Sequence, residues 1–263
     1  MSWRRSFVGG AVGIVGALLA AVPGCGASSG NTSRDVSASV DALEAAAVEA
    51  ALLAIQFDGG SQTLTDVEAA QRAAANMTQA LTPAGCVTAQ VTSNVIAYTL
   101  DGCSGPYGLR QLSGGFSTAL AVIDGRLLAC VAANGLRAGT ARVDMSTWAP
   151  VGATTTTTDQ STGSGTGLRG TSYERNGRYT VSWDGSCLTL SGAWSTTDSG
   201  RRWDTTVTRY GSCTGQCPEA GSVVTLSGGE LSRAVTITYD GDNTAEWTAA
   251  GQQRETISLS CGG

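Results

Sequence analysis

The chain has 263 residues, a formal net charge of −5 and no histidine. All sixteen basic residues are arginine, because the sequence also contains no lysine. These absences exclude serine–histidine and cysteine–histidine catalysis, Schiff-base chemistry on lysine and metal sites that use histidine. The acidic balance, with no basic stripe, also argues against a nucleic-acid partner.

The first 24 residues have the pattern of a secretion signal. Arg4 and Arg5 precede an apolar run from Phe7 to Val22, which is shorter than the roughly 20 residues of a membrane-spanning helix. Val22-Pro23-Gly24-Cys25 then resembles the lipobox of bacterial lipoproteins, which implies cleavage before Cys25 and a diacylglycerol on its sulfur. A signal peptide cut at another bond is the alternative. The arginine pair also resembles a twin-arginine core, so either export route is open.

The lipobox implies an exported protein whose partner is the membrane, reached through the lipid on Cys25. Gly26 is not the aspartate associated with inner-membrane retention, so the outer membrane is the expected location, on its periplasmic or surface face. The small polar residues up to Asp35 indicate a flexible tether. We therefore expect a signal peptide over 1–24, a lipidated tether over 25–35 and a single β-rich domain over 36–263.

A helical cap is expected over 36–82. The segment from Val36 to Phe57 has apolar residues at helical spacing, and Asp41 and Glu44 are placed to favour the dipole of an early helical turn. Thr65-Asp66-Val67-Glu68 has the pattern of a capping box that starts a second helix. We expect both helices to cover one face or one end of a sheet.

After Pro83 the sequence alternates with period two, as in strands with one buried face. Asp-Gly, the strongest short signal for a hairpin turn, follows four apolar runs, at Asp101-Gly102, Asp124-Gly125, Asp184-Gly185 and Asp240-Gly241. The low-complexity segment 153–168 predicts a long loop or a ragged hairpin end. The expected fold is mainly β: an antiparallel multi-stranded meander, as a large sheet, a sandwich or a partly closed barrel, with two N-terminal helices packed on it.

Export makes disulfides the default state of the seven cysteines that follow Cys25. Cys86 and Cys103 flank a predicted hairpin, which brings both thiols to its open end, so we expect them to pair. Cys130 stands within an apolar run and is expected to be a buried free thiol.

The last four cysteines allow three connectivities. We expect Cys187–Cys213 and Cys217–Cys261, with local closure of Cys213–Cys217 as the rival. A structural zinc on all four is the alternative, but tetrathiolate sites present two close pairs of cysteines and only one is close here. No metal or other cofactor is expected from this pattern.

Three further groups are candidates for chemistry. The densest oxygen cluster could hold calcium, although a solvated hairpin tip is preferred because the spacing of a calcium loop is absent; it consists of Asp240, Asp242, Asn243 and Glu246. Five aromatic residues on predicted strands could form a platform for sugar rings or an ordinary core, and core is preferred; they are Trp183, Trp194, Trp203, Tyr210 and Trp247. Paired carboxylates are the enzyme chemistry that remains, but spacing indicates no pair among the acidic candidates Glu174, Asp184, Asp204, Asp240 and Glu246. Asp198-Ser199-Gly200 resembles an aspartic-protease loop and is better interpreted as a turn.

The turns and cysteines of 83–263 also resemble those of secreted lipoproteins from myxobacterium-like genomes. The resemblance rests on Pro83-Ala84-Gly85-Cys86, Asp101-Gly102-Cys103, Gly215-Gln216-Cys217-Pro218 and the Tyr239-Asp240-Gly241 turn with Cys261. It implies a disulfide-stapled β fold on a lipid anchor and assigns no activity, ligand or catalytic residue.

We therefore expect a non-enzymatic structural or interaction protein of the cell envelope, with an envelope protein or a glycan as its unidentified partner. The alternative is a glycan- or lipid-binding module, and a carboxylate-dependent hydrolase comes third. A deep apolar cavity between helices and sheet would favour lipid binding. Two carboxylates facing each other in a cleft would favour the hydrolase.

Overall fold

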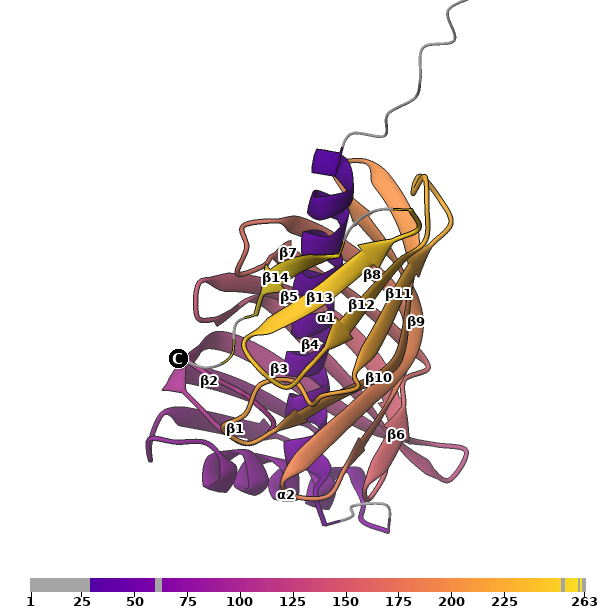
Figure 1. Cartoon of the computed structure of the whole chain (residues 1–263). Helices are drawn as coiled ribbons and strands as arrows, with labels where there is room; N and C mark the ends of the chain where they lie inside the picture. The colour runs from indigo at the N-terminus through magenta and orange to yellow at the C-terminus, as the bar shows by residue number, and fades with distance from the viewer. Residues whose placement is uncertain (1–28, 60–62, 252–253, 260, 262–263) are drawn as a thin grey trace, which may run out of the picture.

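The computed structural model describes residues 29–59, 63–251, 254–259 and 261. It is mainly antiparallel β, with one 14-stranded open sheet and two helices near the N-terminus (Figure 1). The expected fold class is confirmed, and the sheet is a single large one. No helix among the described residues is both long and apolar enough to cross a membrane.

The helices are α1 (Ser29–Phe57) and α2 (Asp66–Ala80). The strands are β1 (Val87–Thr92), β2 (Val95–Cys103), β3 (Leu112–Ile123), β4 (Arg126–Ala138), β5 (Ala141–Pro150), β6 (Thr155–Thr157), β7 (Gln160–Thr166), β8 (Ser172–Trp183), β9 (Cys187–Asp198), β10 (Arg201–Cys213), β11 (Val223–Ser227), β12 (Val235–Tyr239), β13 (Thr244–Ala249) and β14 (Glu255–Ser258). Each strand pairs with its neighbours along the chain, except that short β6 pairs with β8 while β7 lies between β5 and β8.

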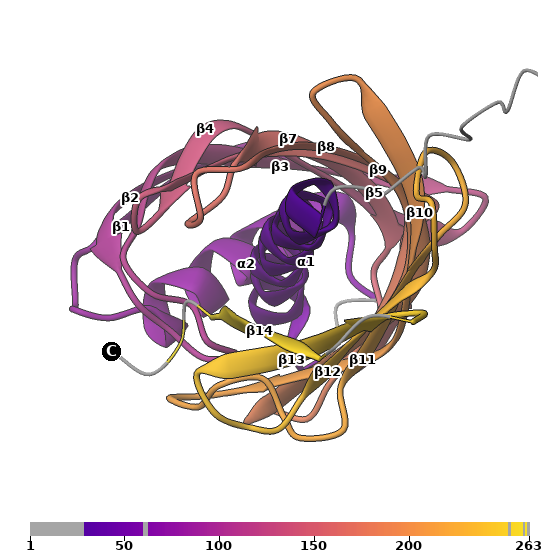
Figure 2. The same ribbon diagram turned by 45° about the horizontal axis from the view of Figure 1, so that its top comes forward.

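The sheet curls around α1, which Figure 2 shows almost end-on inside the curve, with α2 beside it. The helices therefore lie on the concave side of the sheet. Helix α1 is rich in alanine, so it is thin enough to be enclosed, and nearly all of its side chains from Asp35 to Phe57 are buried or half-buried. A helix that is apolar around its whole circumference is typically a buried one.

The boundary between tether and domain differs from the prediction. Helix α1 begins at Ser29, so residues 29–35 are helical and only 25–28 remain for a tether. Arg34 and Asp35, predicted to lie in the tether, form ion pairs with Asp198 and Arg201. The signal peptide and Cys25 lie outside the described residues.

Helix α2 begins as predicted. The Thr65 N–H donates to Glu68 Oε2 at 3.0 Å, and the Glu68 N–H donates to Thr65 Oγ1 at 3.3 Å. This capping box satisfies two of the amide donors that every helix start leaves without a helical partner. The buried face of α2, which includes Ala73 and Met77, belongs to the same core as α1 and the first strands.

The Asp-Gly dipeptides are found in two structural settings, a hairpin turn and a bulge within a strand. Asp124-Gly125 is the predicted two-residue turn between β3 and β4, with positive φ at both residues as this turn requires. Asp101-Gly102 is not a turn but lies inside β2, where the register with β3 shifts between Leu100 and Cys103. Gly102 has φ +64°, so the dipeptide forms a bulge within a longer strand.

The prediction of a loop over 153–168 is wrong, because the segment contains β6 and β7. Its threonines are β-branched and suit strands. Its glycines permit close approach: a Cβ on Gly163 would lie 2.9 Å from Arg175 Nη2, and one on Gly165 would lie 1.9 Å from the Arg142 carbonyl oxygen. Glycine here allows β7 to pack against its neighbours and does not interrupt the sheet.

Candidate ligand-binding site

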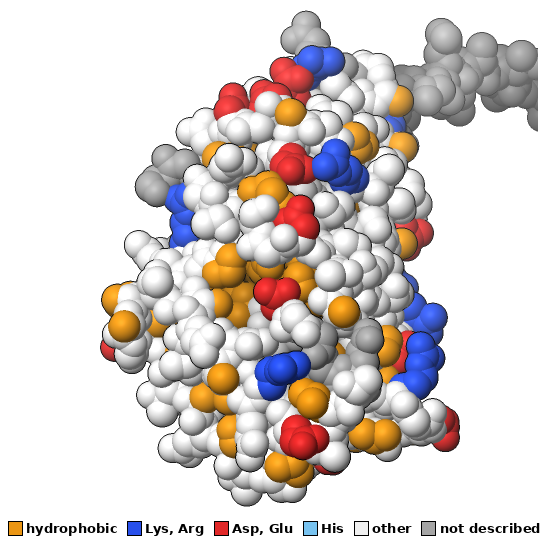
Figure 3. Space-filling model, turned by 90° about the horizontal axis from the view of Figure 1, so that it is seen from below, with side chains coloured by type: hydrophobic (Ala, Val, Ile, Leu, Met, Phe, Trp, Pro, Cys, Tyr) orange, Lys and Arg blue, Asp and Glu red, His pale blue; other side chains and the backbone are white. Residues whose placement is uncertain are grey.

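A cavity of about 1010 Å³ lies between α1 and the sheet. It is comparable with the largest pockets that bind small molecules, which reach about 1,000 Å³. Its apolar lining comes from α1 and from the strands and loops opposite, and includes Ala45, Val48, Leu109, Val143 and Tyr210. Seen from below, where α2 lies, the surface is hollowed near its centre and hydrophobic side chains gather in the hollow (Figure 3).

Two carboxylates that line this cavity, Asp41 and Glu44, bind Arg169, which lies in the loop between β7 and β8. Arg169 Nη1 donates to Asp41 Oδ1 at 2.6 Å and to Glu44 Oε2 at 2.9 Å, and Nη2 donates to Glu44 Oε1 at 3.0 Å. Nε and Nη2 both donate to the carbonyl oxygen of Ser258, at 3.0 and 2.6 Å. One guanidinium therefore joins two carboxylates of α1 to the last strand of the sheet.

Burial shapes the electrostatics of this cluster. It would by itself lower the pKa of Arg169, but hydrogen bonds and charge from Glu44 and Asp41 outweigh it, and the pKa of Arg169 is raised. Burial also raises the pKa of Asp41, and Arg169 offsets only part of that shift.

Two side chains that line the cavity each have a buried polar atom with no hydrogen-bond partner among the described residues. These atoms are Asp41 Oδ2 and the Tyr173 hydroxyl oxygen. Both residues are 2 % exposed. Gly167 lies directly against the Asp41 carboxylate, since a Cβ there would be 1.9 Å from Asp41 Cγ. Buried polar atoms are rarely left without a partner, so these two mark a place where a ligand atom could bind.

A second buried polar cluster on α1 is formed by Glu49 and its hydrogen-bond partners. Glu49 Oε2 accepts a hydrogen bond from Arg175 Nη2 at 2.8 Å. Glu49 Oε1 accepts hydrogen bonds from Tyr179 at 2.6 Å and Ser161 at 2.9 Å, and also from Thr147. Both oxygens of Glu49 are thus occupied by the protein, so this cluster fixes α1 in the sheet, while Arg175 Nε has no hydrogen-bond partner among the described residues.

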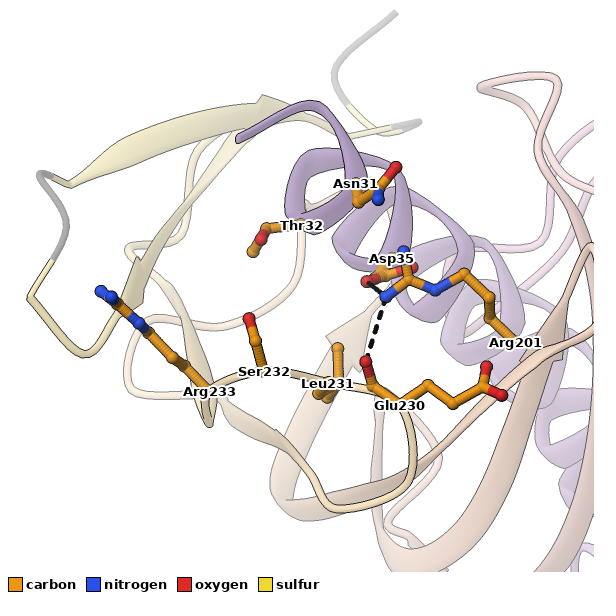
Figure 4. Close-up of a pocket in the computed structure, with 8 residues that line it drawn as sticks. All are labelled: Asn31, Thr32, Asp35, Arg201, Glu230, Leu231, Ser232 and Arg233. Carbon is orange, nitrogen blue, oxygen red and sulfur yellow. Dashed lines mark hydrogen bonds and ion pairs between the residues drawn. The ribbon is translucent and has the colours of Figure 1, made fainter. Parts of the chain in front are cut away.

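A small polar pocket of about 230 Å³ lies at the N-terminal end of α1 (Figure 4). Arg201 Nη2 donates to Asp35 Oδ2 at 2.8 Å and to the Glu230 carbonyl oxygen at 3.3 Å. Burial raises the pKa of Asp35 to about 6, against the lowering effect of Arg201. These bonds join the start of α1 to the β11–β12 loop.

A third hollow, of about 640 Å³, lies over β4, β5 and β7 to β10. Most of its lining is polar, as in Asn134, Ser146 and Thr197, and no aromatic side chain lines it. It therefore lacks the apolar character of the main cavity.

The structure contains the disulfides Cys86–Cys103, Cys187–Cys213 and Cys217–Cys261. These are the expected pairs, and the rival Cys213–Cys217 closure is wrong.

Cys130 is a free thiol, as predicted, but it is half-exposed rather than buried. The strand alternates Leu127, Ala129 and Val131 inward, which turns Cys130 to the outer face opposite Trp148.

The calcium candidates are not gathered into a site. Asp242 Oδ1 accepts hydrogen bonds from the Thr244 amide and hydroxyl, at 2.7 and 2.8 Å, and Glu246 pairs with Arg254 at 2.7 Å. Asp240 and Asn243 lie in the same exposed hairpin tip. In the described part of the chain, three metal-ligand side chains converge only at Cys187, Cys213 and Glu219, and a disulfide joins these two cysteines.

The five aromatic residues form ordinary core, as preferred from the sequence, and the alternative of a sugar platform is excluded. All five of its aromatic residues are buried, with exposures of 5 % or less, and none is available to stack on a sugar; they are Trp183, Trp194, Trp203, Tyr210 and Trp247. Asp198 pairs with Arg34, and Ser199-Gly200 forms the two-residue turn between β9 and β10. The other acidic candidates for a catalytic pair are spread over different strands and turns: Glu174, Asp184, Asp204, Asp240 and Glu246.

Asp41 and Glu44 were predicted to lie in an early helical turn, whereas they lie in the middle of α1. No role was predicted for Glu49. A usable signal was present: a carboxylate in a helix that is apolar on all sides must be buried and therefore paired. Sequence alone could not identify Arg169 and Arg175 as the partners, because they lie more than 120 residues further along the chain.

The chain matches no protein-family model, no curated protein and no solved structure.

Proposed function

We propose that the protein binds an apolar or amphiphilic molecule in the cavity beside α1, without catalysing a reaction, while a lipid on Cys25 holds it to the cell envelope. The observation that carries the proposal is the cavity of about 1010 Å³ with mostly apolar walls between helix and sheet. Such a cavity was the feature that would favour lipid binding over the other functions considered.

The buried acids of the cavity support binding rather than hydrolysis. Asp41 and Glu44 do not form an acid–base pair across a cleft, because both bind the same guanidinium of Arg169. Glu44 uses both of its oxygens in this way. A general acid or base needs a proton that it can exchange with substrate, and Glu44 is held in a bidentate ion pair instead.

The proposed anchor gives the molecule an orientation. Cleavage before Cys25 would leave 26–28 between the lipidated cysteine and Ser29, the first residue of α1. An extended chain spans at most about 3.6 Å per residue, so the start of α1 would stand within about 14 Å of the anchor. The N-terminal end of α1 and the adjoining β11–β12 loop would then face the bilayer. Export also agrees with the three disulfides, which are typical of oxidising compartments.

Titration with a neutral fluorescent probe, N-phenyl-1-naphthylamine, tests the binding function. We expect saturable binding of about one probe per chain. Ala47→Trp, which adds an indole to the α1 wall of the cavity, should weaken binding about tenfold or more, which is a loss of at least 1.4 kcal/mol. Val122→Trp, on the exposed outer face, is the matched control and should bind as the unchanged protein does. Absence of saturable binding, or equal binding by both variants, would refute the proposal.

The anchor is tested separately in cells. Cys25→Ser should move the protein from the membrane fraction to the soluble fraction, because the thioether to the lipid cannot form. Cys130→Ser, which removes the free thiol of the folded domain, should leave the protein in the membrane fraction. If the Cys25→Ser protein stays membrane-bound, the anchor is wrong, whatever the probe titration gives.

A further inference from the structure

The two unpartnered atoms in the cavity have different requirements. Asp41 Oδ2 is a carboxylate oxygen, and an ionised carboxylate can only accept hydrogen bonds. The Tyr173 hydroxyl can both donate and accept. A ligand group that satisfies both atoms must therefore offer at least one donor, which goes to Asp41.

Arg169 cannot serve as a cationic site for the same ligand. A guanidinium has five N–H donors, and Arg169 makes five hydrogen bonds, to Asp41, to Glu44 and to the Ser258 carbonyl. Its donors are fully used inside the protein. Around Asp41, two carboxylates thus face one guanidinium, so an anionic head group would meet excess negative charge and find no donor on Arg169.

Arg110 is the remaining charged residue of the cavity wall, in the loop between β2 and β3. An anionic ligand would have to use Arg110, because the Asp41 end opposes it. Arg110 must therefore be part of any test of head-group charge.

We infer that the cavity takes an amphiphile whose head group donates hydrogen bonds and carries no negative charge, such as a primary ammonium or a hydroxyl on an aliphatic chain. The head group lies at Asp41 Oδ2 and Tyr173, and the chain lies along the apolar wall formed by Ala45, Val48 and Val143. This inference rests on the proposed binding function and specifies the class of ligand.

Competition between decylamine, 1-decanol and decanoate tests the inference, because the three share one chain and differ in head group. Each competitor is titrated against bound N-phenyl-1-naphthylamine at pH 7.5 and fixed ionic strength. Each competitor is kept below the concentration at which it aggregates. We expect decylamine and decanol to compete about tenfold better than decanoate, the size expected of one hydrogen bond to a charged group. Asp41→Asn should reduce the advantage of decylamine over decanoate to less than about threefold.

Asp204→Asn is the matched control, because it removes a carboxylate from the exposed side of β10; it should keep the full preference. Tyr173→Phe keeps the ring, and should weaken decanol about fivefold relative to decanoate. If Asp41→Asn fails to fold, the Tyr173→Phe variant still tests the head-group site. Arg110→Gln should leave decylamine binding unchanged within about twofold.

Three results would overturn the inference. The first is that decanoate competes as well as decylamine, the second that the preference survives Asp41→Asn, and the third that Arg110→Gln abolishes competition by all three ligands. In each of these cases the probe itself still binds, so the proposed binding function stands. Failure of the probe to bind the unchanged protein would overturn both.

Discussion

Glu49 and Arg175 form an ion pair of 2.8 Å inside the curled sheet, and neither side chain is more than 1 % exposed. Removing one partner of a buried pair leaves an uncompensated charge, which costs about 3–5 kcal/mol. Glu49→Gln should therefore lower the free energy of unfolding by an amount in that range, measured by urea denaturation. Glu246→Gln breaks a surface pair with Arg254 and should cost less than about 1 kcal/mol. Equal losses in the two variants would show that burial of the first pair is unimportant.

Asp35 should make stability depend on pH. Its pKa in the folded protein is about 6, above the ordinary value of 3.8, because burial disfavours its charge. The folded state therefore holds the proton more tightly, so this contribution to stability is fully present below about pH 4 and is lost as the pH rises towards 6. The charged groups that influence it are Arg201, Asp198, Arg34 and Glu230.

The measurement compares unfolding free energies of the unchanged protein and Asp35→Asn at pH 4, 5, 6, 7 and 8. The difference between them should change mainly across the window from 4 to 6 and stay constant from about 7 upwards. Other acids, including Asp41, titrate in both proteins and cancel in the difference. A difference that is flat over the whole range would contradict the raised pKa.

The Cys217–Cys261 disulfide closes the longest loop, because its cysteines are separated by 44 positions along the chain. It ties the segment after the terminal strand β14 to the β10–β11 loop. On the chain-entropy relation such a loop is worth about 4 kcal/mol. The double variant Cys217→Ser/Cys261→Ser should lose about that much in urea unfolding, and amides of β13 and β14 should exchange faster. Cys130→Ser, in contrast, should change stability by less than about 1 kcal/mol, since the thiol is half-exposed.

Cys130 should react slowly with thiol reagents in the folded protein. Burial raises the pKa of its thiol, which lowers the fraction of reactive thiolate at neutral pH. In protein that carries Cys25→Ser, one thiol should react with Ellman's reagent before reduction, and its rate should rise in denaturant. More than one fast-reacting thiol would mean that a described disulfide does not form in the protein.

The repeated local signals made much of the fold predictable. The capping box at Thr65, the turn at Asp124-Gly125 and the hydrophobic alternation of the strands each depend on neighbours in sequence. The errors arose where tertiary contacts override local signals. Asp101-Gly102 is typical of a turn, yet β2 continues through it as a bulge. Glycines that suggested a loop in β7 instead make room for Arg175.

The candidate site was less predictable than the fold. The Cys86–Cys103 disulfide could be predicted because a hairpin brings its two cysteines together. The cavity could not be predicted from the sequence, because its size depends on how far the sheet curls around α1. The role of Asp41 likewise depends on Arg169, which lies 128 residues further along the chain, and no local pattern joins the two.

The strand order also bears on how the protein is assembled. A meander lets each new hairpin add to one already formed, and such local contacts favour rapid folding. Helix α1 is made before any strand, however, and its partners come much later: Thr147, Arg175 and Tyr179 follow Glu49 by 98, 126 and 130 residues. In a chain that folds as it is made, the Glu49 carboxylate would therefore lack its Arg175 partner until β8 is available. The buried ion pair between α1 and the sheet can therefore form only after about half of the strands have been made.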